Sequence, residues 1–246
     1  MSRFYVPKEC VKDGNILVEG DEARHILKVM RLKEGDGVVV FDGTGCEYSG
    51  FIKDADERNN RAIVEIVKEE RPPKEAAAEI ILAQAIPKRK KMDWIIEKAT
   101  ELGVSRIIPM ISERTIVRPN DQRKMDDKAE RWRKIAREAS KQCGRTDVPR
   151  IEDLTLYGQV TAHMDEYDLA LMACLEEDRV SLKSAIKNIK SGKIIVFIGP
   201  EGDFTREELV MADKDNCRFI SLGKRVLKSD TAGLFVLSAL AYEMGI

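Results

Sequence analysis

Two short polar loops in the last third of the chain have the composition of a ligand-binding site. The first, residues 199–203 (GPEGD), follows an apolar run at residues 194–198 that predicts a buried strand. Glycine lets a backbone approach a ligand closely, so that the N–H and C=O groups of the loop would do the recognising. Thr205 and Glu208 then predict a capping box that begins a helix. A strand, a glycine loop and a helix in this order form the usual ligand site of open α/β sheets.

The first loop lacks the pattern that binds phosphates. A dinucleotide fingerprint needs G-x-G-x-x-G, whereas Glu201 occupies the middle of this loop and would repel a pyrophosphate. Residues 223–225 (GKR) do not complete a nucleoside-triphosphate loop, because Arg225 stands where Ser or Thr must meet magnesium. The expected ligand is therefore small and cationic or neutral.

A second loop of the same kind spans residues 221–232. It leaves a predicted strand at 218–222 and enters a helix at 231–244 that Ser229 or Asp230 would cap. This helix is apolar on nearly every side and too short to span a bilayer, so we expect it to be buried in the protein or between subunits. Two such loops beside one strand predict a ligand site more specifically than either loop alone.

The middle of the chain is cationic. Residues 86–150 hold 18 basic and 10 acidic side chains, whereas the whole chain has 42 and 43, which points to a local surface for a polyanion. A predicted helix at 126–143 and the residues just after it carry a row of cations, namely Arg131, Lys134, Arg137, Lys141 and Arg145. Such a row follows a phosphate backbone well, although a solvated charged face is the plain alternative.

The elements that position these residues fall into two parts, divided at residues 71–74 (RPPK). Residues 1–72 alternate short β runs with turns around one helix at 21–29, which predicts a small, mostly β barrel. Residues 73–246 alternate strands and helices, which predicts a mostly parallel sheet covered by helices. The predicted strands there are residues 80–85, 106–111, 169–174, 194–198 and 218–222, and the helices are residues 88–102, 126–143, 181–189, 206–212 and 231–244.

Composition excludes several classes of protein. No apolar run reaches the roughly 18 residues of a membrane helix, and the N-terminus lacks the features of a signal peptide. The five cysteines are scattered and there are two histidines, which argues against a disulfide framework and a metal centre. We expect a cytoplasmic protein without a metal or a membrane contact.

The two loops also carry a family resemblance. Residues 198–208 (IGPEGDFTREE) resemble the IGPEGGxxxxE motif of the RsmE family, the small-subunit rRNA uridine-N3 methyltransferases of the SPOUT superfamily, and residues 222–232 (LGKRVLKSDTA) resemble its LGxRILRxETA motif. Further matches occur in order along the whole chain, at residues 3–5 (RFY), 25–31 (HILKVMR), 98–114 and 142–145 (QCGR). The departures are Asp203 for Gly, Lys228 for Arg and Asp230 for Glu.

The resemblance implies a fold and partners that periodicity alone does not predict. It implies an N-terminal PUA-like β-barrel that helps to hold RNA and a C-terminal SPOUT domain that ends in a trefoil knot, where periodicity would predict an ordinary doubly wound sheet. It also implies S-adenosylmethionine as the cofactor, 16S rRNA within the small ribosomal subunit as the substrate, and a homodimer with the last helix at its interface.

Site residues follow from the same resemblance. The expected cofactor site contains Met172, Ala173, Ile198, Gly199, Pro200, Glu201, Gly202, Leu222, Gly223, Val226, Leu227 and Ser229. Methylation at N3 requires loss of a proton and stabilisation of the uracil anion. The expected cationic donors are Arg3, Arg114, Arg145 and Lys228, and the base is Asp230 or Glu201. The expected RNA contacts are Arg24, Arg31, Lys88, Arg89, Lys134, Arg137 and Lys141.

Two other classes of function compete with this interpretation. One is a nucleotide-cofactor enzyme on a Rossmann sheet, which the missing glycine pattern disfavours. The other is a non-catalytic rRNA-binding assembly factor, for which the departures at Asp203, Lys228 and Asp230 are the support.

Overall fold

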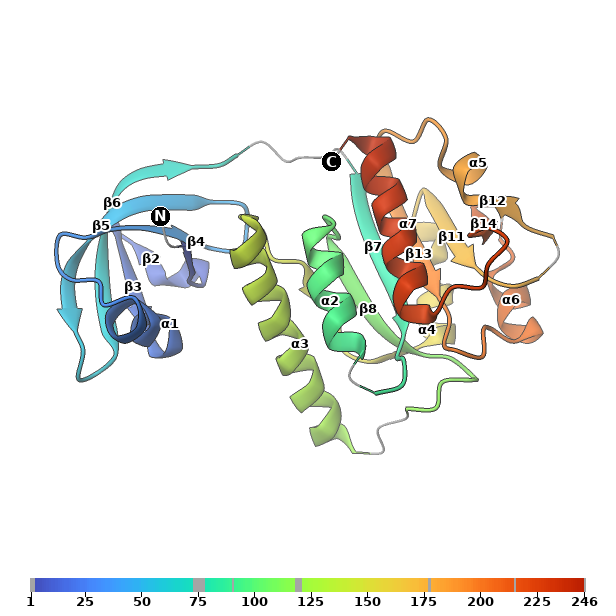
Figure 1. The fold of residues 1–246 in the computed structure, drawn as a ribbon, viewed down its shortest axis with the longest axis horizontal. Helices are drawn as coiled ribbons and strands as arrows, with labels where there is room; N and C mark the ends of the chain where they lie inside the picture. The colour runs from blue at the N-terminus through green and yellow to red at the C-terminus, as the bar shows by residue number, and fades with distance from the viewer. Residues whose placement is uncertain are drawn as a thin grey trace. The chain divides into compact units, whose positions relative to one another are not determined.

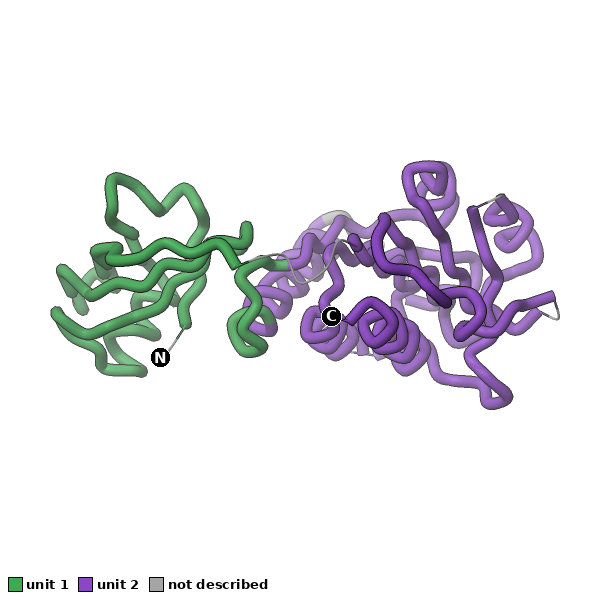
Figure 2. Tube along the Cα trace, turned by 90° about the horizontal axis from the view of Figure 1, so that it is seen from above, with its two compact units in different colours: residues 1–74, 140–148 green, residues 75–139, 149–246 purple. Residues whose placement is uncertain are grey.

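The structure, a computed structural model, describes residues 3–72, 78–89, 91–117, 121–176, 178–214 and 216–245. The chain forms two compact units, Met1–Lys74 with Ser140–Val148, and Glu75–Ala139 with Pro149–Ile246 (Figure 2). A single boundary after Pro72 therefore misses one feature, because a later segment returns to the first unit. Pro73 and Lys74, part of the expected divider, lie outside the described residues.

The first unit is built on a six-stranded sheet with the order β1-β4-β5-β6-β3-β2. Its strands are β1 (Arg3–Tyr5), β2 (Val11–Lys12), β3 (Asn15–Glu19), β4 (Gly37–Phe41), β5 (Glu47–Asp56) and β6 (Arg61–Glu70). Alternation sets its core, since Ile16 and Val18 of β3 and Ala62 and Val64 of β6 are all buried. A 3-10 turn, η1 (Lys8–Cys10), lies between β1 and β2. The helix expected at 21–29 is α1 (Gly20–Arg24) followed by a π-turn, η2 (His25–Val29).

Residues 140–148 are joined to the first unit by backbone hydrogen bonds. The N–H of Gly45 donates to the carbonyl of Thr146 at 3.1 Å, and the N–H of Val148 donates to that of Gly43 at 3.0 Å. Gly43 has a left-handed φ of 76°, and a Cβ there would lie 2.9 Å from the ring of Tyr5. The turn between β4 and β5 therefore needs this glycine to receive the returning segment.

The second unit contains a sheet in which every strand pair is parallel, with the order β10-β8-β7-β13-β11-β14-β12 and β9 paired to β8. The strands are β7 (Ala78–Ala85), β8 (Arg106–Ile111), β9 (Arg150–Ile151), β10 (Thr155–Leu156), β11 (Leu169–Ala173), β12 (Val180–Ser181), β13 (Gly192–Ile198) and β14 (Cys217–Ser221). The expected parallel sheet is confirmed.

Helices cover both faces of this sheet (Figure 1). They are α2 (Lys91–Glu101), α4 (Tyr157–Ala162) with the 3-10 turn η3 (Met164–Glu166), α5 (Leu182–Ile186), α6 (Arg206–Ala212) and α7 (Ser229–Met244), while α3 (Gln122–Cys143) runs from the second unit into the first. In β7, Ile81 and Ala83 pack in the core cluster of α4 and α6, whereas Leu82 and Gln84 point toward α7.

Some element boundaries differ from the expected ones. The helix expected at 181–189 ends at Ile186, α3 begins at Gln122, and α4 was not predicted. Helix α7 begins at Ser229, and its N-cap position is Lys228 without a side-chain cap, so capping by Ser229 or Asp230 was wrong. The hydroxyl of Ser229 is used elsewhere, as described below.

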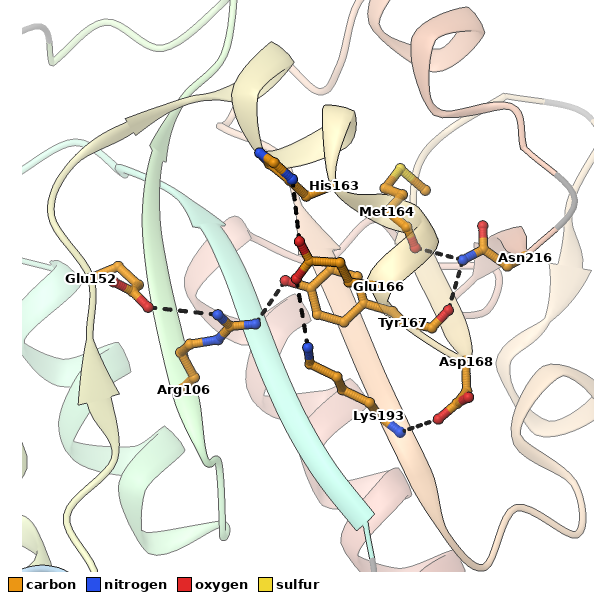
Figure 3. A network of polar contacts seen from close by, with 9 residues as sticks. All are labelled: Arg106, Glu152, His163, Met164, Glu166, Tyr167, Asp168, Lys193 and Asn216. Carbon is orange, nitrogen blue, oxygen red and sulfur yellow. Dashed lines mark hydrogen bonds and ion pairs between the residues drawn. The ribbon is translucent and has the colours of Figure 1, made fainter.

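Ion pairs and hydrogen bonds link the elements at the amino-terminal edge of the parallel sheet, where Arg106 pairs with Glu152 at 3.6 Å and Lys193 pairs with Glu166 at 3.8 Å (Figure 3). Arg106, at the start of β8, donates to the hydroxyl of Tyr167 at 2.8 Å, and the backbone N–H of Lys193 donates to Asp168 at 2.7 Å. The side chain of Asn216 donates to the carbonyls of Met164 and Tyr167. Burial raises the pKa of Tyr167 despite the nearby Arg106. These contacts indicate a structural role for this edge.

No described helix combines the length and the apolar character that crossing a bilayer requires.

Candidate functional site

A cavity of about 230 Å³ opens at the carboxyl-terminal edge of β11, β13 and β14. This is the edge at which parallel α/β sheets bind ligands. Two loops form much of its wall: loop A, residues 199–204, follows β13, and loop B, residues 222–228, follows β14. The lining residues are Ala173, Cys174, Leu175, Arg179, Ile198, Gly199, Pro200, Glu201, Asp203, Leu222, Gly223, Arg225, Val226, Leu227, Lys228, Ser229 and Ala232.

Arg114 holds loop A through its backbone. One guanidinium nitrogen, Nη1, donates to the carbonyl of Gly202 at 2.7 Å and to that of Phe204 at 3.1 Å. A Cβ at Gly202 would meet the side chain of Arg114, with a nearest distance of 3.3 Å. Gly202 therefore makes room for Arg114.

Carboxylates hold loop A to its neighbours as well. Oε1 of Glu201 accepts the backbone N–H of Lys88 at 3.0 Å, which ties the loop to the segment after β7. Oδ2 of Asp203 accepts the backbone N–H of Leu175 at 2.7 Å, which ties it to the segment after β11. Asp203 has a left-handed φ of 60°, a conformation that Asp tolerates better than most residues. The negative charge of Asp203 thus has a structural use in the wall of the cavity.

The predicted capping box at α6 is confirmed and has a further contact. Thr205 Oγ1 accepts the N–H of Glu208, and the carboxylate of Glu208 accepts the N–H of Thr205. The buried Glu208 also accepts the N–H of Glu113 at 2.7 Å. Glu208 therefore positions the segment that carries Arg114.

Loop B is exposed and has few internal contacts. The side chain of Val226 is 74% exposed although it lines the cavity. Within the part of the chain that the structure describes, residues 224–227 take part in no hydrogen bond. This wall is consequently much less constrained than loop A.

Cys174 lines the cavity but is a poor nucleophile there. Burial raises the pKa of its thiol above the ordinary value. Because the thiolate is the reactive form, covalent catalysis through Cys174 at neutral pH is disfavoured.

The structure brings most of the expected cofactor residues together at the cavity. Two are not part of the lining: Met172 is fully buried within β11, and Gly202 faces Arg114. Arg179 and Arg225 contribute cations to the lining that were not expected there. Nothing in the sequence indicated that Arg179 would be part of this lining.

The six expected catalytic residues divide between the two units. Arg3 and Arg145 belong to the first unit, where the guanidinium of Arg3 pairs with Glu47 and donates to the carbonyl of Arg145 at 3.4 Å. Arg114, Glu201, Lys228 and Asp230 belong to the second unit. There, Glu201 and Lys228 line the cavity, whereas Asp230 pairs with Lys91 at 3.1 Å and its other oxygen is buried.

The expected RNA contacts differ in accessibility. Arg24, Arg31, Lys88, Arg89 and Lys134 are exposed, whereas Arg137 is partly buried and pairs with Glu130. The side chain of Lys141 is 13% exposed, and its ammonium contacts both carboxylate oxygens of Glu22 at 3.0 Å. Lys141 thereby helps to fix the end of α3 in the first unit, a role that its sequence position did not reveal.

Comparisons with known proteins agree on one family. An RNA methyltransferase domain matches residues 74–241, and an RNA methyltransferase PUA domain matches residues 18–66. The chain is 32% identical to ribosomal RNA small subunit methyltransferase E of Bacillus subtilis, covering 99% of this chain and 97% of the relative. It is 28% identical to the Synechocystis protein of the same name, covering 97% and 76%.

A solved structure agrees with these relatives. Ribosomal RNA small subunit methyltransferase E from Neisseria gonorrhoeae, bound to S-adenosyl methionine, superposes with a TM-score of 0.84 at 30% identity, covering 98% of this chain and 97% of that one.

Proposed function

Because the chain belongs to the RNA methyltransferase family that includes ribosomal RNA small subunit methyltransferase E, we propose that it methylates N3 of one uridine in 16S rRNA within the small ribosomal subunit. Its N-terminal part is a PUA-like domain, and the protein is an S-adenosylmethionine-dependent rRNA methyltransferase. The observation that carries the proposal is the charged cavity between loops A and B.

The side chains of the cavity suit this cofactor. Glu201 and Asp203 offer negative charge to its sulfonium and ammonium groups, and Arg179 and Arg225 offer positive charge to its carboxylate. Apolar contact for the adenosine would come from Leu175, Ile198, Val226 and Leu227. When bound, the cofactor supplies an electrophilic methyl group.

The residues of the chain would prepare the uracil. N3 carries a proton at neutral pH, so a base must remove it and a cation must stabilise the charge on the uracil oxygens. Of the four expected cationic donors, Lys228 is the one that lines the cavity, while Arg114 is engaged in holding loop A. Glu201 is favoured over Asp230 as the base, because Glu201 is exposed at the cavity and the unpaired oxygen of Asp230 is buried.

Recognition of the RNA would use exposed cations of both units. Arg24 and Arg31 belong to the PUA-like domain, and Lys88 and Arg89 precede α2. Lys134 lies on α3. Arg3 and Arg145 of the first unit remain candidates for stabilising the uracil anion, although their side chains are only 17% and 11% exposed, and Lys141 would hold the end of α3 in place.

Nucleoside mass spectrometry tests the reaction. Small subunits from a strain that lacks the enzyme, incubated with the protein and S-adenosylmethionine, should yield N3-methyluridine.

Glu201→Gln should lower kcat by about 100-fold, as for loss of a general base, and Asp230→Asn should lower it by much less. Arg31→Ala should raise KM for the RNA while cofactor affinity stays unchanged. Methylation of another atom, or none, would contradict the proposal.

The assembly is proposed to be a homodimer whose subunits meet through α7. The support is an apolar face of α7, on which Phe235 is 47% exposed and Tyr242 is 87% exposed. Trp94 of α2, a helix that packs against α7, is 45% exposed. Leu237 is fully buried within the second unit, so substitution there would test folding instead of assembly.

Family membership also supports a trefoil knot near α7, in place of an ordinary doubly wound sheet.

Light scattering at micromolar concentration tests the dimer. The wild type should have twice the monomer mass, and Phe235→Asp should shift it to the monomer by burying an unpaired charge. Met211→Asp places the same charge at a 55% exposed apolar position of α6 and should leave the mass unchanged. A monomeric wild type would refute the dimer without touching the proposed reaction.

A further inference from the structure

Gln84 is a fully buried polar residue in the part of β7, residues 80–85, that is otherwise apolar and buried, and it lies close to the cavity without being part of its lining. It lies at the carboxyl end of β7, in register with Ile198 of β13, which leads into loop A. Its side chain points to the same face as Leu82, toward α7. An apolar residue would suit this face better than an amide, so the amide needs an explanation.

The amide connects both walls of the cavity through one serine. Nε2 of Gln84 donates to Oγ of Ser229 at 2.9 Å and to the carbonyl of Ala85 at 3.0 Å. Oγ of Ser229 donates in turn to the carbonyl of Gly199 at 2.6 Å. Gly199 begins loop A, and Ser229 directly follows loop B.

The direction of this relay is fixed by the chemistry of its members. A serine hydroxyl has one proton, and because Gln84 donates to Ser229, that proton is left for the carbonyl of Gly199. Turning the amide over would place its oxygen near the carbonyl of Ala85, where two acceptors would repel each other. The peptide between Gly199 and Pro200 is thereby held with its oxygen toward α7.

The relay has a measurable cost in the fold. Oε1 of Gln84 is buried without a hydrogen-bond partner among the described residues, and a buried acceptor left in this state destabilises the fold. Gly233, inside α7, makes room for it, since a Cβ there would lie 3.1 Å from Oε1. Glycine within a helix is also destabilising relative to alanine. Both features lower stability, which points to a role other than holding the core together.

We propose that Gln84 is a positioning residue for the methyl donor, which fixes the separation of loops A and B through Ser229 and never touches the ligand. This inference rests on the proposed function, because it assumes that the cavity binds S-adenosylmethionine. In the sequence, Gln84 is marked only by being the one amide within the apolar run at residues 80–86.

Titration calorimetry with S-adenosylmethionine and thermal unfolding of the free protein test the proposal together. Gln84→Met keeps the size of the side chain but removes the donor and the unpaired oxygen, so Kd should rise by about tenfold while the melting temperature stays level or rises. Ser229→Ala should raise Kd similarly, and the double variant should bind no more weakly than the weaker single variant, because the relay acts as a unit.

Ile80→Val is the matched control, on the same face of the same strand. It should lower the melting temperature by removing a buried methyl group and leave Kd unchanged. Unchanged affinity in Gln84→Met would overturn the inference, and so would additive losses in the double variant. If Gln84→Met does not fold, Gly233→Ala, which crowds Oε1, must weaken binding or the inference fails. A wild type that does not bind the cofactor would refute the proposed function instead.

Discussion

Loops A and B form two walls of one cavity, yet the structure holds them very differently. In loop A, Arg114 engages the carbonyls of Gly202 and Phe204, and Asp203 reaches the backbone of Leu175. In loop B, residues 224–227 make no hydrogen bond within the described chain, and Val226 is 74% exposed. Loop A is thus held in place before the ligand binds, whereas loop B can gain contacts when the ligand binds. Preorganisation of this kind lowers the ordering cost of binding.

The largest effect on cofactor affinity should come from removing the contacts that hold loop A. Arg114→Met removes charged hydrogen bonds to two carbonyls, and we expect calorimetry to show about 100-fold weaker S-adenosylmethionine binding. Arg206→Met, at an exposed arginine that begins α6, is the matched control and should bind normally. Equal affinities for the two variants would mean that loop A keeps its shape without Arg114.

A smaller effect on cofactor affinity should come from a substitution in loop B. Val226→Ser removes an exposed apolar side chain that would be covered only by the ligand, so Kd should rise by about threefold, the value of a partly buried side chain. The melting temperature of the free protein should not change, because Val226 packs against little in its absence. A clear drop in melting temperature would show that loop B is already packed, and the contrast between the walls would disappear.

The parts of the fold that periodicity predicted are those in which a short stretch of sequence decides the outcome. The run at residues 194–198 is apolar at every position because β13 is buried on both faces, and it became a central parallel strand. The capping box of Thr205 and Glu208 is equally local. Helix α4 escaped prediction because its six residues include Gly158 and carry little periodic signal.

The sequence predicted where the candidate site lies better than it predicted which contacts the residues of the site make. Loops A and B were identified from glycines and charges, but the partners of those charges come from distant parts of the chain. Lys141 pairs with Glu22, and Ser229 forms hydrogen bonds with Gln84 and Gly199. The spacing of residues in the sequence does not predict these contacts. The sequence therefore did not predict the neighbours of the residues that were expected to meet RNA or cofactor.

The return of residues 140–148 to the first unit also has a consequence for the order of synthesis. Gly43 and Gly45 find their hydrogen-bond partners at Val148 and Thr146, which the ribosome adds long after residue 74. At bacterial elongation rates of about 5–20 residues per second, the PUA-like domain waits about 4–15 s for its last segment. The growing chain therefore cannot complete the first unit before it has begun the second.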